Sequence, residues 1–379
     1  MSMRRNWMIF AFATLFLAVT GMDLCTKDRL FSENENRMLQ QKPVFSVKNF
    51  LSGQYGKECD AYVTDQFVGR DNWIRLKTGT ELALGETLLN GIYIGSDGYL
   101  FEQHLSVQAG GSGVLEENTD RKLTKLVSDL EGYRNVRIML VPSAAALLPE
   151  KLPPHAAGQE FDQTAFLEQA EQTVSDGLSV NTWVDVKGLL EEHREEDIYY
   201  KTDHHWTTLG AYYGYRAWAE SMGYEPKSLK SYERECVAED FQGTLQSRLN
   251  LSWEPDRIEV FRSLQPFSYE VTYDAGAKGT HSLYEESYLN TKNKYGYFLD
   301  DNHALVEIQT EGSSQPQRSL AVIKDSYANC LIPFLTEHYG RVYVMDKRYY
   351  HGSVDALMEE KGIDDLLVLY QVTSFLDNY

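Results

Sequence analysis

A short polar cluster at residues 201–207 carries the clearest chemistry in the sequence. At its centre are Asp203, His204 and His205, followed by Trp206. A neutral imidazole can take the proton of a nucleophilic hydroxyl when a carboxylate fixes its tautomer through the other ring nitrogen. Residues two apart in an extended segment face the same way. We therefore expect Asp203 to orient His205 as a general base, with His204 on the opposite face as a structural residue.

Two other interpretations of this cluster remain open. In the first, Asp203 caps a helix that Trp206 anchors, so that the cluster is purely structural. In the second, the histidines bind zinc, which would favour a His-x3-His spacing or a further ligand close by. The sequence offers neither around residues 203–205. We therefore expect no metal and no cofactor.

The expected nucleophile is Ser326. It follows the apolar run 320–323 and precedes a predicted helix that begins at Tyr327. A hydroxyl at such a turn is lifted above a sheet, near helix N-terminal amides that can stabilise an oxyanion. Tyr327 is therefore a candidate for substrate or oxyanion binding. The G-x-S-x-G pattern of α/β-hydrolases is absent, and the alternative is that Ser326 or Asp325 only caps the helix.

Short apolar runs that alternate with helical patterns predict the elements that position these groups. The expected strands are 136–141, 183–186, 320–323, 342–345 and 366–370, and the expected helices are 208–222 after a Thr207 cap, 327–337 and 354–360. This alternation implies right-handed crossovers and a parallel sheet, with ligands beyond the carboxyl ends of the strands. Arg348 and Gln371 follow such ends and are candidate substrate or oxyanion residues. The alternatives are a surface ion pair for Arg348 and a structural role for Gln371.

The remaining segments predict supporting structure. Helical periodicity runs through residues 50–89, a hairpin turns at residues 96–98, and a flexible joint falls at 109–113. A helix is expected at 123–130. Residues 245–315 are predicted to be an irregular, β-rich excursion whose many tyrosines either stack on sugar rings or pack in the core.

The N-terminus has the pattern of a targeting segment. Arg4 and Arg5 precede an uncharged run from Asn6 to Met22, which Asp23 ends. A basic flank followed by an apolar run is typical of an uncleaved membrane anchor or a cleaved secretory signal. We favour the anchor. Both interpretations put the body outside the cytoplasm, whereas the third, a buried helix, does not.

Composition excludes several functions. The 379 residues include 36 Lys and Arg against 56 Asp and Glu, a net charge of −20. Such an acidic surface repels phosphate backbones, so we expect no nucleic-acid partner. The four cysteines form no C-x-x-C motif. They are either paired or buried as free thiols.

Taken together, the motifs resemble the DHHW proteins, which belong with the SGNH hydrolase-like proteins of the alginate O-acetyltransferase type. The resemblance is carried by Asp203–Trp206 and Asp325–Tyr327, and by residues 31–37, 65–71 and 95–101. Lys324 stands where SGNH proteins usually have glycine. The resemblance implies a three-layer α/β/α, flavodoxin-like parallel sheet that is circularly permuted. It also implies a multi-pass membrane-bound O-acyltransferase as acetyl donor, and makes Arg348 an attractive active-site residue. No carbohydrate-binding module is expected after Tyr379.

The sequence thus predicts an N-terminal anchor or signal segment (1–26), a juxtamembrane helical and hairpin region (27–113) and an SGNH-like catalytic domain (114–379). The predicted function is extracytoplasmic O-acetyl transfer to a polysaccharide of the cell envelope or a secreted one, through Ser326, His205 and Asp203. A carbohydrate esterase with the same triad and a non-catalytic envelope scaffold are the alternatives.

Overall fold

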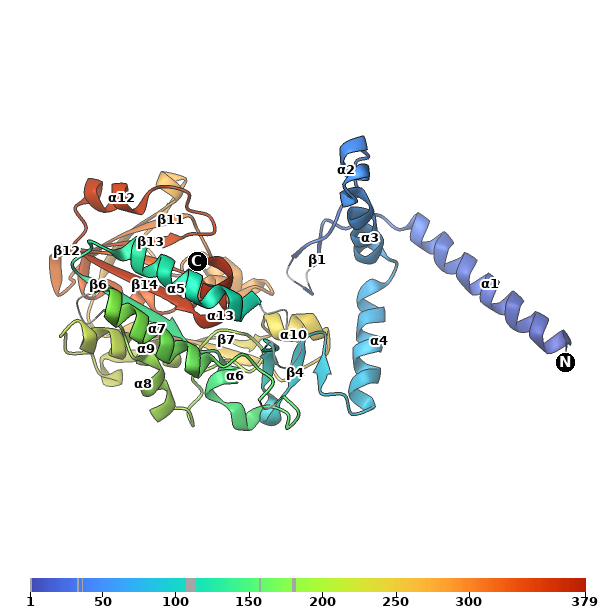
Figure 1. Cartoon of the computed structure of the whole chain (residues 1–379), viewed down its shortest axis with the longest axis horizontal. Coiled ribbons are helices and arrows are strands. Elements are labelled where there is room, and N and C mark those ends of the chain that lie inside the picture. The colour runs from blue at the N-terminus through green and yellow to red at the C-terminus, as the bar shows by residue number, and fades with distance from the viewer. Residues whose placement is uncertain (1, 33, 36, 107–113, 157, 179–181) are drawn as a thin grey trace. The chain divides into compact units, whose positions relative to one another are not determined.

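The computed structural model describes the chain except residues 1, 33, 36, 107–113, 157 and 179–181. The chain forms two compact units (Figure 1). The first contains residues 1–90 and 246–252, and the second contains residues 91–245 and 253–379. The flexible joint predicted at 109–113, and the domain boundary predicted at residue 113, lie outside the described residues. The other predicted domain boundaries stay predictions.

The first unit is mainly helical. Its elements are α1 (Ser2–Cys25), β1 (Phe31–Ser32), β2 (Arg37–Met38), α2 (Val47–Leu51), α3 (Gln54–Gln66), α4 (Arg70–Ala83) and β3 (Leu88–Leu89). The helical periodicity of residues 50–89 is confirmed, although it is divided among separate helices. The break between α3 and α4 falls at Gly69, whose φ of 65° lies in the left-handed region that glycine adopts without strain.

Helix α1 is the apolar N-terminal segment. Residues Trp7–Cys25 are long and apolar enough to cross a membrane, and none of that stretch is buried. The predicted helix is therefore confirmed, and the exposure of its side chains contradicts the alternative of a buried helix. A membrane anchor and a secretory signal both fit a helix of this length and composition.

The second unit carries the sheet. Its helices are α5 (Val114–Leu130), α6 (Ala144–Leu147), α7 (Gln163–Gly177), α8 (Val186–Glu192), α9 (Thr208–Ser221), α11 (Ile332–Thr336), α12 (Val354–Lys361) and α13 (Val372–Asn378), and α10 (Thr244–Leu249) begins in this unit. Its strands are β4 (Ile92–Ile94), β5 (Leu100–Glu102), β6 (Val136–Val141), β7 (Tyr232–Phe241), β8 (Asp256–Ser263), β9 (Ser268–Tyr273), β10 (Lys278–Thr280), β11 (Leu305–Glu311), β12 (Gln315–Lys324), β13 (Tyr339–Asp346) and β14 (Asp365–Gln371). The predicted hairpin is formed by β4 and β5.

The main sheet is mixed. Among the described residues its order is β10-β9-β11-β13-β12-β14-β6. The pairs β13–β12, β12–β14 and β14–β6 are parallel, as the alternating pattern predicts. Strands β11, β9 and β10 join in antiparallel pairs. The expectation of a parallel sheet therefore holds for one half of the sheet only.

Apolar residues bury both faces of the parallel strands. Alternate residues such as Ile138 and Val368 pack on one face against α5, α7, α12 and α13 (Figure 1). The intervening residues, among them Val322, are also buried. Trp218 of α9 packs against Tyr339 at the start of β13, with ring centroids 6.1 Å apart. Burial on both faces explains why these strands are continuous apolar runs rather than alternating ones.

Two predicted elements are wrong in detail. Among the described residues, Trp183 makes only an isolated bridge to Ile138, and α8 begins at Val186. Residues 183–185 lead into a helix that the Asp185 side chain caps, and they form no strand. The helix expected at 327–337 is a 3₁₀ turn followed by α11, because Pro333 lacks a backbone N–H and disfavours helix before it.

The segment 245–315 is not a separate excursion. Strands β9, β10 and β11 extend the main sheet, while 3₁₀ turns at Glu286–Asn290 and Lys294–Tyr297 connect them. Its tyrosines are not exposed: Tyr273, Tyr295 and Tyr297 are buried, and the others are half-buried. Core packing, rather than an exposed stacking surface for sugars, is therefore their role. All four cysteines are free.

Candidate active site

The nucleophile turn follows the central strand β12. Lys324, the last residue of β12, is in register with Asp346 of β13 and Leu369 of β14. Ser326 begins a 3₁₀ turn just beyond this edge and is partly exposed. Parallel strands therefore bring the turn to the edge where ligands bind in such sheets.

Three side chains form a chain of hydrogen bonds at this turn. Nδ1 of His205 lies 2.5 Å from Asp203 Oδ1, and Nε2 of His205 lies 2.8 Å from Ser326 Oγ. An ionised carboxylate can only accept, so Nδ1 carries the proton and donates it to Asp203. Nε2 is then left to accept from the Ser326 hydroxyl, which is the geometry of an imidazole that serves as a base towards serine.

Asp203 reaches His205 by a different route from the one expected. Residues 201–205 form bends rather than an extended segment. Asp203 Oδ1 also accepts from the His205 backbone N–H at 3.0 Å, which is an Asx turn. Because the chain bends, His204 does not face the opposite side: its ring centroid lies 3.9 Å from that of His205. Nδ1 of His204 is 2.7 Å from Thr244 Oγ1.

The second oxygen of Asp203 is fixed by residues that the sequence did not single out. Asp203 Oδ2 accepts from the Thr244 backbone N–H at 2.8 Å and from its hydroxyl at 3.1 Å. Gly243 precedes Thr244, and a Cβ on Gly243 would lie 2.2 Å from the Asp203 Cβ. Only glycine permits this close approach. A glycine followed by a threonine that begins the short helix α10 was the available signal.

Strand β8 holds the start of the same loop. The Asp256 carboxylate accepts from the backbone N–H groups of Lys201 and Thr202, at 2.9 and 2.7 Å, and from the Thr202 hydroxyl at 2.5 Å. Burial raises the pKa of Asp256. These bonds fix the residues immediately before Asp203, so the loop is held from both sides.

Electrostatics favour a neutral imidazole and a charged carboxylate. Burial lowers the pKa of His205 to about 4, with His204 and Arg348 lowering it further and Asp203 opposing them. Burial alone would raise the pKa of Asp203, but His204, His205 and the Thr244 backbone N–H hold it below its usual value. At neutral pH, His205 is therefore an unprotonated base beside an ionised Asp203.

Tyr295 is a further residue that sequence reasoning missed. Its ring stacks on the His205 imidazole, with centroids 3.8 Å apart and an angle of 11° between the planes. Its hydroxyl lies 3.2 Å from the Ser326 carbonyl oxygen and 3.3 Å from Cys330 Sγ. Tyr295 thus contacts the residues on both sides of the hydrogen bond between His205 and Ser326. The abundance of tyrosine in its segment gave no indication of which one does so.

The other predicted site residues lie nearby and make contacts within the protein, and their roles towards a substrate or an oxyanion stay predictions. The Tyr327 backbone N–H donates to Asp325 at 2.9 Å, so this amide already has an acceptor, and its hydroxyl donates to the His204 carbonyl. Gln371 caps α13 by accepting from the Ser374 N–H at 2.9 Å. Arg348 pairs with buried Asp346, at 2.9 and 2.6 Å, while its side chain remains partly exposed.

A metal is disfavoured by the donor set. Asp203, His204 and His205 do offer ligand atoms within 4.8 Å of one another. However, Nδ1 of His205 donates to Asp203, and Nδ1 of His204 is bonded to Thr244. A tetrahedral site that used either of these nitrogens would require its bond to break.

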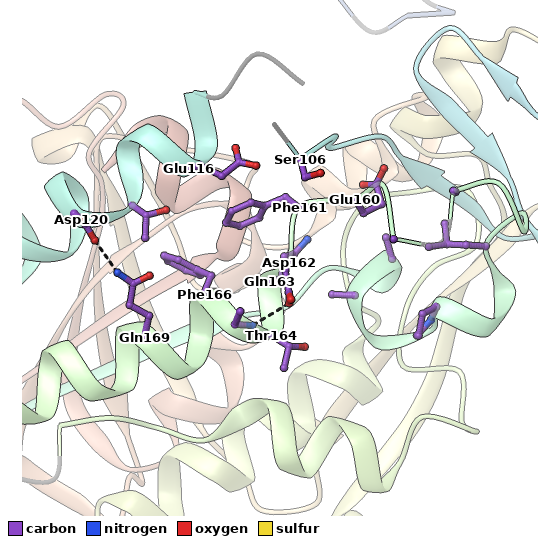
Figure 2. A pocket seen from close by; sticks show the side chains of 18 residues that line it. Ser106, Glu116, Asp120, Glu160, Phe161, Asp162, Gln163, Thr164, Phe166 and Gln169 are labelled. Atoms are coloured by element: carbon purple, nitrogen blue, oxygen red, sulfur yellow. Dashed lines mark hydrogen bonds between the residues drawn. The ribbon is translucent and has the colours of Figure 1, made fainter. Parts of the chain in front are cut away.

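Of the cavities in the second unit, one lies next to the triad and another is much larger. A cavity of about 230 Å³ is lined by Asp203, His204 and Tyr327, next to the triad. A larger one of about 850 Å³ lies elsewhere, and Figure 2 shows its lining. None of the 18 residues that line it belongs to the triad, and its labelled carboxylates include Glu116 and Asp120. The described residues that line the larger cavity include no histidine that could act as a base, so we place the chemistry at the smaller one, which Asp203 lines.

Comparison with known proteins agrees with the resemblance that the motifs predicted. The family model described as DHHW protein matches residues 179–345, which contain the cluster around His205 and the turn of Ser326. The crystal structure of a DHHW family protein from Eubacterium siraeum is 25% identical, covers 76% of this chain and 92% of its own, and has a TM-score of 0.63. The suspected relationship to DHHW proteins is confirmed.

Two further structures show how far the similarity extends. Bacillus cereus PatB1 with a sulfonyl adduct is 20% identical, covers 75% of this chain and 95% of its own, and has a TM-score of 0.58. This similarity indicates a shared fold. The O-acetyltransferase domain of Pseudomonas putida AlgJ is 15% identical over 76% of this chain and 92% of its own, and its TM-score of 0.42 is too low to define a common fold. No curated protein matches the sequence.

Proposed function

We propose that this protein is an O-acetyltransferase that transfers an acetyl group to a hydroxyl of a polysaccharide through an acyl-enzyme on Ser326. The observation that carries the proposal is the chain of hydrogen bonds from Asp203 through His205 to Ser326. The fold shared with PatB1 supports it: that protein was captured with a sulfonyl adduct, and sulfonyl reagents combine with nucleophilic side chains.

The geometry supplies both half-reactions. Ser326 Oγ attacks the acetyl carbonyl while His205 Nε2 takes the hydroxyl proton, and the proton then passes to the leaving group of the donor. His205 is neutral again once the acetyl-serine has formed. It next takes the proton of an acceptor hydroxyl, whose oxygen attacks the ester, and it returns the proton to Ser326 Oγ. Ionised Asp203 stabilises the imidazolium in each half-reaction.

The setting of the reaction forms part of the same proposal. The exposed apolar helix α1 supports an anchor in the membrane, with the body on the extracytoplasmic face and a multi-pass membrane-bound O-acyltransferase as acetyl donor. The acceptor polysaccharide belongs to the cell envelope or is secreted. We further propose the three-layer, circularly permuted form of the SGNH fold, in which the Asp203 cluster precedes the nucleophile in the sequence.

Ser326→Ala tests the proposal. The full-length protein is incubated with 4-nitrophenyl acetate, with and without an oligosaccharide, and released nitrophenol and acetylated sugar are both measured. Substitution should lower turnover by about 10⁴-fold or more without changing the melting temperature, because no other hydroxyl is bonded to His205 Nε2 among the described residues. Acetylated sugar identifies a transferase, whereas release of acetate alone identifies the esterase. Equal turnover by the Ser326→Ala protein and the wild type would favour a non-catalytic scaffold.

A further inference from the structure

A buried lysine lies two residues before the nucleophile. Lys324 is 2% exposed. Lysine is almost never fully buried unless it is paired. Its Nζ donates to Asn302 Oδ1 and to Asn329 Oδ1, both at 2.8 Å, and lies 3.6 Å from Asp346 Oδ2. Each of these three oxygens belongs to a different segment of the chain.

The contacts of Lys324 join the parts that surround Ser326. Asn329 closes the nucleophile turn, since its N–H donates to the Ser326 carbonyl at 3.2 Å. Asp346 ends β13 and holds the Arg348 guanidinium. Burying an ammonium is costly even beside an ion-paired carboxylate such as Asp346, so the hydrogen bonds to both asparagines are needed to keep the cation inside.

The third contact reaches a strained backbone. Leu299, Asp300 and Asp301 have φ angles of 58°, 56° and 70°, a left-handed run that non-glycine residues rarely adopt. Asn302 follows this run directly, and Asn329 Nδ2 donates to the Asp301 carbonyl at 3.2 Å. The strained turn is therefore tied to the nucleophile turn through the same pair of amides that Lys324 holds.

We propose that Lys324 is a positioning residue of the acyl-transfer site, which fixes the Ser326 turn through Asn329 and the Arg348 guanidinium through Asp346. The inference rests on the proposed function of Ser326. Lys324 itself need not touch the substrate, because its ammonium is enclosed by these side chains. An error of about 1 Å in the position of a reacting atom costs about 10²-fold in rate.

The charge of Lys324 adds a pH dependence. Burial lowers the pKa of Lys324 to about 8; Asp346 opposes this shift, Arg348 adds to it, and Asp325 and Asp301 oppose it. These charged groups lie just after β12, at and just after the end of β13, and in the strained turn. The ammonium is present below a pH of about 8 and lost above it, so positioning by a charged Lys324 weakens as the pH rises through this value.

The test compares wild type, Lys324→Met, Asn329→Ala and Lys347→Met in hydrolysis of 4-nitrophenyl acetate from about pH 5.5 to 9.5, a range that brackets the lysine pKa. Lys347 is exposed and serves as the matched control. Lys324→Met should lower kcat by about 10²-fold at neutral pH with little change in KM. It should also lose the alkaline decline of kcat that the wild type shows. Lys347→Met should behave as wild type.

Each result decides one of the two proposals. If Lys324→Met does not fold, Asn329→Ala keeps the lysine but cuts its link to the nucleophile turn, and it should lower kcat in the same direction. Wild-type kcat and an unchanged alkaline decline in both variants would overturn the role of Lys324. A wild-type rate no higher than that of Ser326→Ala would instead refute the acyl-transfer site itself.

Discussion

Two segments meet at Ser326, and they are held in place in opposite ways. The turn after β12 is fixed by the register of parallel strands, in which Lys324 stands opposite Asp346 and Leu369. The segment 294–302 belongs to no strand. It is held by turn hydrogen bonds, by an isolated bridge between Phe298 and Tyr284, and by side-chain contacts such as the stack of Tyr295 on His205. Three successive residues in it, 299–301, have left-handed φ angles.

This difference predicts which substitutions around Ser326 the site tolerates (the robust part) and which lower activity (the fragile part). A strand end is held by many backbone hydrogen bonds and by core packing on both faces, so one lost contact is shared among the rest. The irregular segment has no regular ladder of hydrogen bonds, so individual contacts, such as the stack of Tyr295 on His205, determine the positions of particular groups. We therefore expect substitutions in 294–302 to affect activity more than substitutions of capping residues at the strand ends, such as Gln371, at equal cost in stability; buried Lys324, whose Nζ bonds to Asn302 of the irregular segment, belongs with the first group.

Substitution of the two adjacent histidines should give the largest difference in turnover, against which the effects of the other variants can be compared. His205→Ala should lower turnover by about 10⁴-fold, because Ser326 then lacks the base that is 2.8 Å from its hydroxyl. His204→Ala should cost less than about 10-fold, since Nδ1 of His204 contacts Thr244 rather than the nucleophile. Steady-state hydrolysis of an acetyl ester by both variants measures the ratio. Activity in His205→Ala with none in His204→Ala would exchange the two roles.

Tyr295 tests the fragile segment directly. Tyr295→Phe removes only the hydroxyl, which lies 3.2 Å from the Ser326 carbonyl oxygen, and it should cost a few-fold in kcat. Tyr295→Leu also removes the ring that stacks on His205, so the imidazole gains freedom and kcat should fall by about 10²-fold.

Titration of His205 by NMR separates this effect from a loss of folding. Burial lowers the pKa of His205 to about 4, and a smaller side chain at residue 295 admits water to the imidazole, which should move the pKa upward. Tyr297→Leu is the control, because Tyr297 is buried in the same segment but stacks on Tyr284. Equal loss of activity in Tyr295→Leu and Tyr297→Leu would show that the segment acts only through its stability.

The regular elements were largely predictable from the sequence, and the irregular ones were not. Continuous apolar runs identified β6, β12, β13 and β14, because strands that are buried on both faces need no polar residues. The motif spacing also selected Asp203, His205 and Ser326, which the structure brings within hydrogen-bond distance. The reason offered for Asp203 was wrong, since an Asx turn aligns it rather than an extended segment.

The contacts of Tyr295 and Lys324 could not be predicted from the neighbouring sequence. Tyr295 reaches His205 from a segment far along the chain, and nothing in the tyrosine-rich sequence distinguishes it from its neighbours. Lys324 ends an apolar run, where a charged residue normally marks the surface, and its burial depends on oxygens from residues 302, 329 and 346. Such partners are defined by the tertiary fold, so periodicity and propensity cannot reveal them.

Substitution of Gln371, at the end of β14, tests the strand ends, and we expect it to have the smallest effect on activity. Its Oε1 accepts from the Ser374 N–H at 2.9 Å and from the Thr373 hydroxyl at 2.7 Å, so Gln371→Ala removes the cap of α13. Loss of an N-cap costs about 1 kcal/mol, which should lower the melting temperature by about 2–4 °C. Gln371→Ser should recover most of this loss, because a serine hydroxyl can accept from the same N–H.

Activity should stay close to wild type in both variants, since strand register still holds the edge beside Ser326. A large fall in kcat in Gln371→Ala at an unchanged melting temperature would mean that Gln371 takes part in the chemistry, and that the strand ends are as fragile as the segment 294–302.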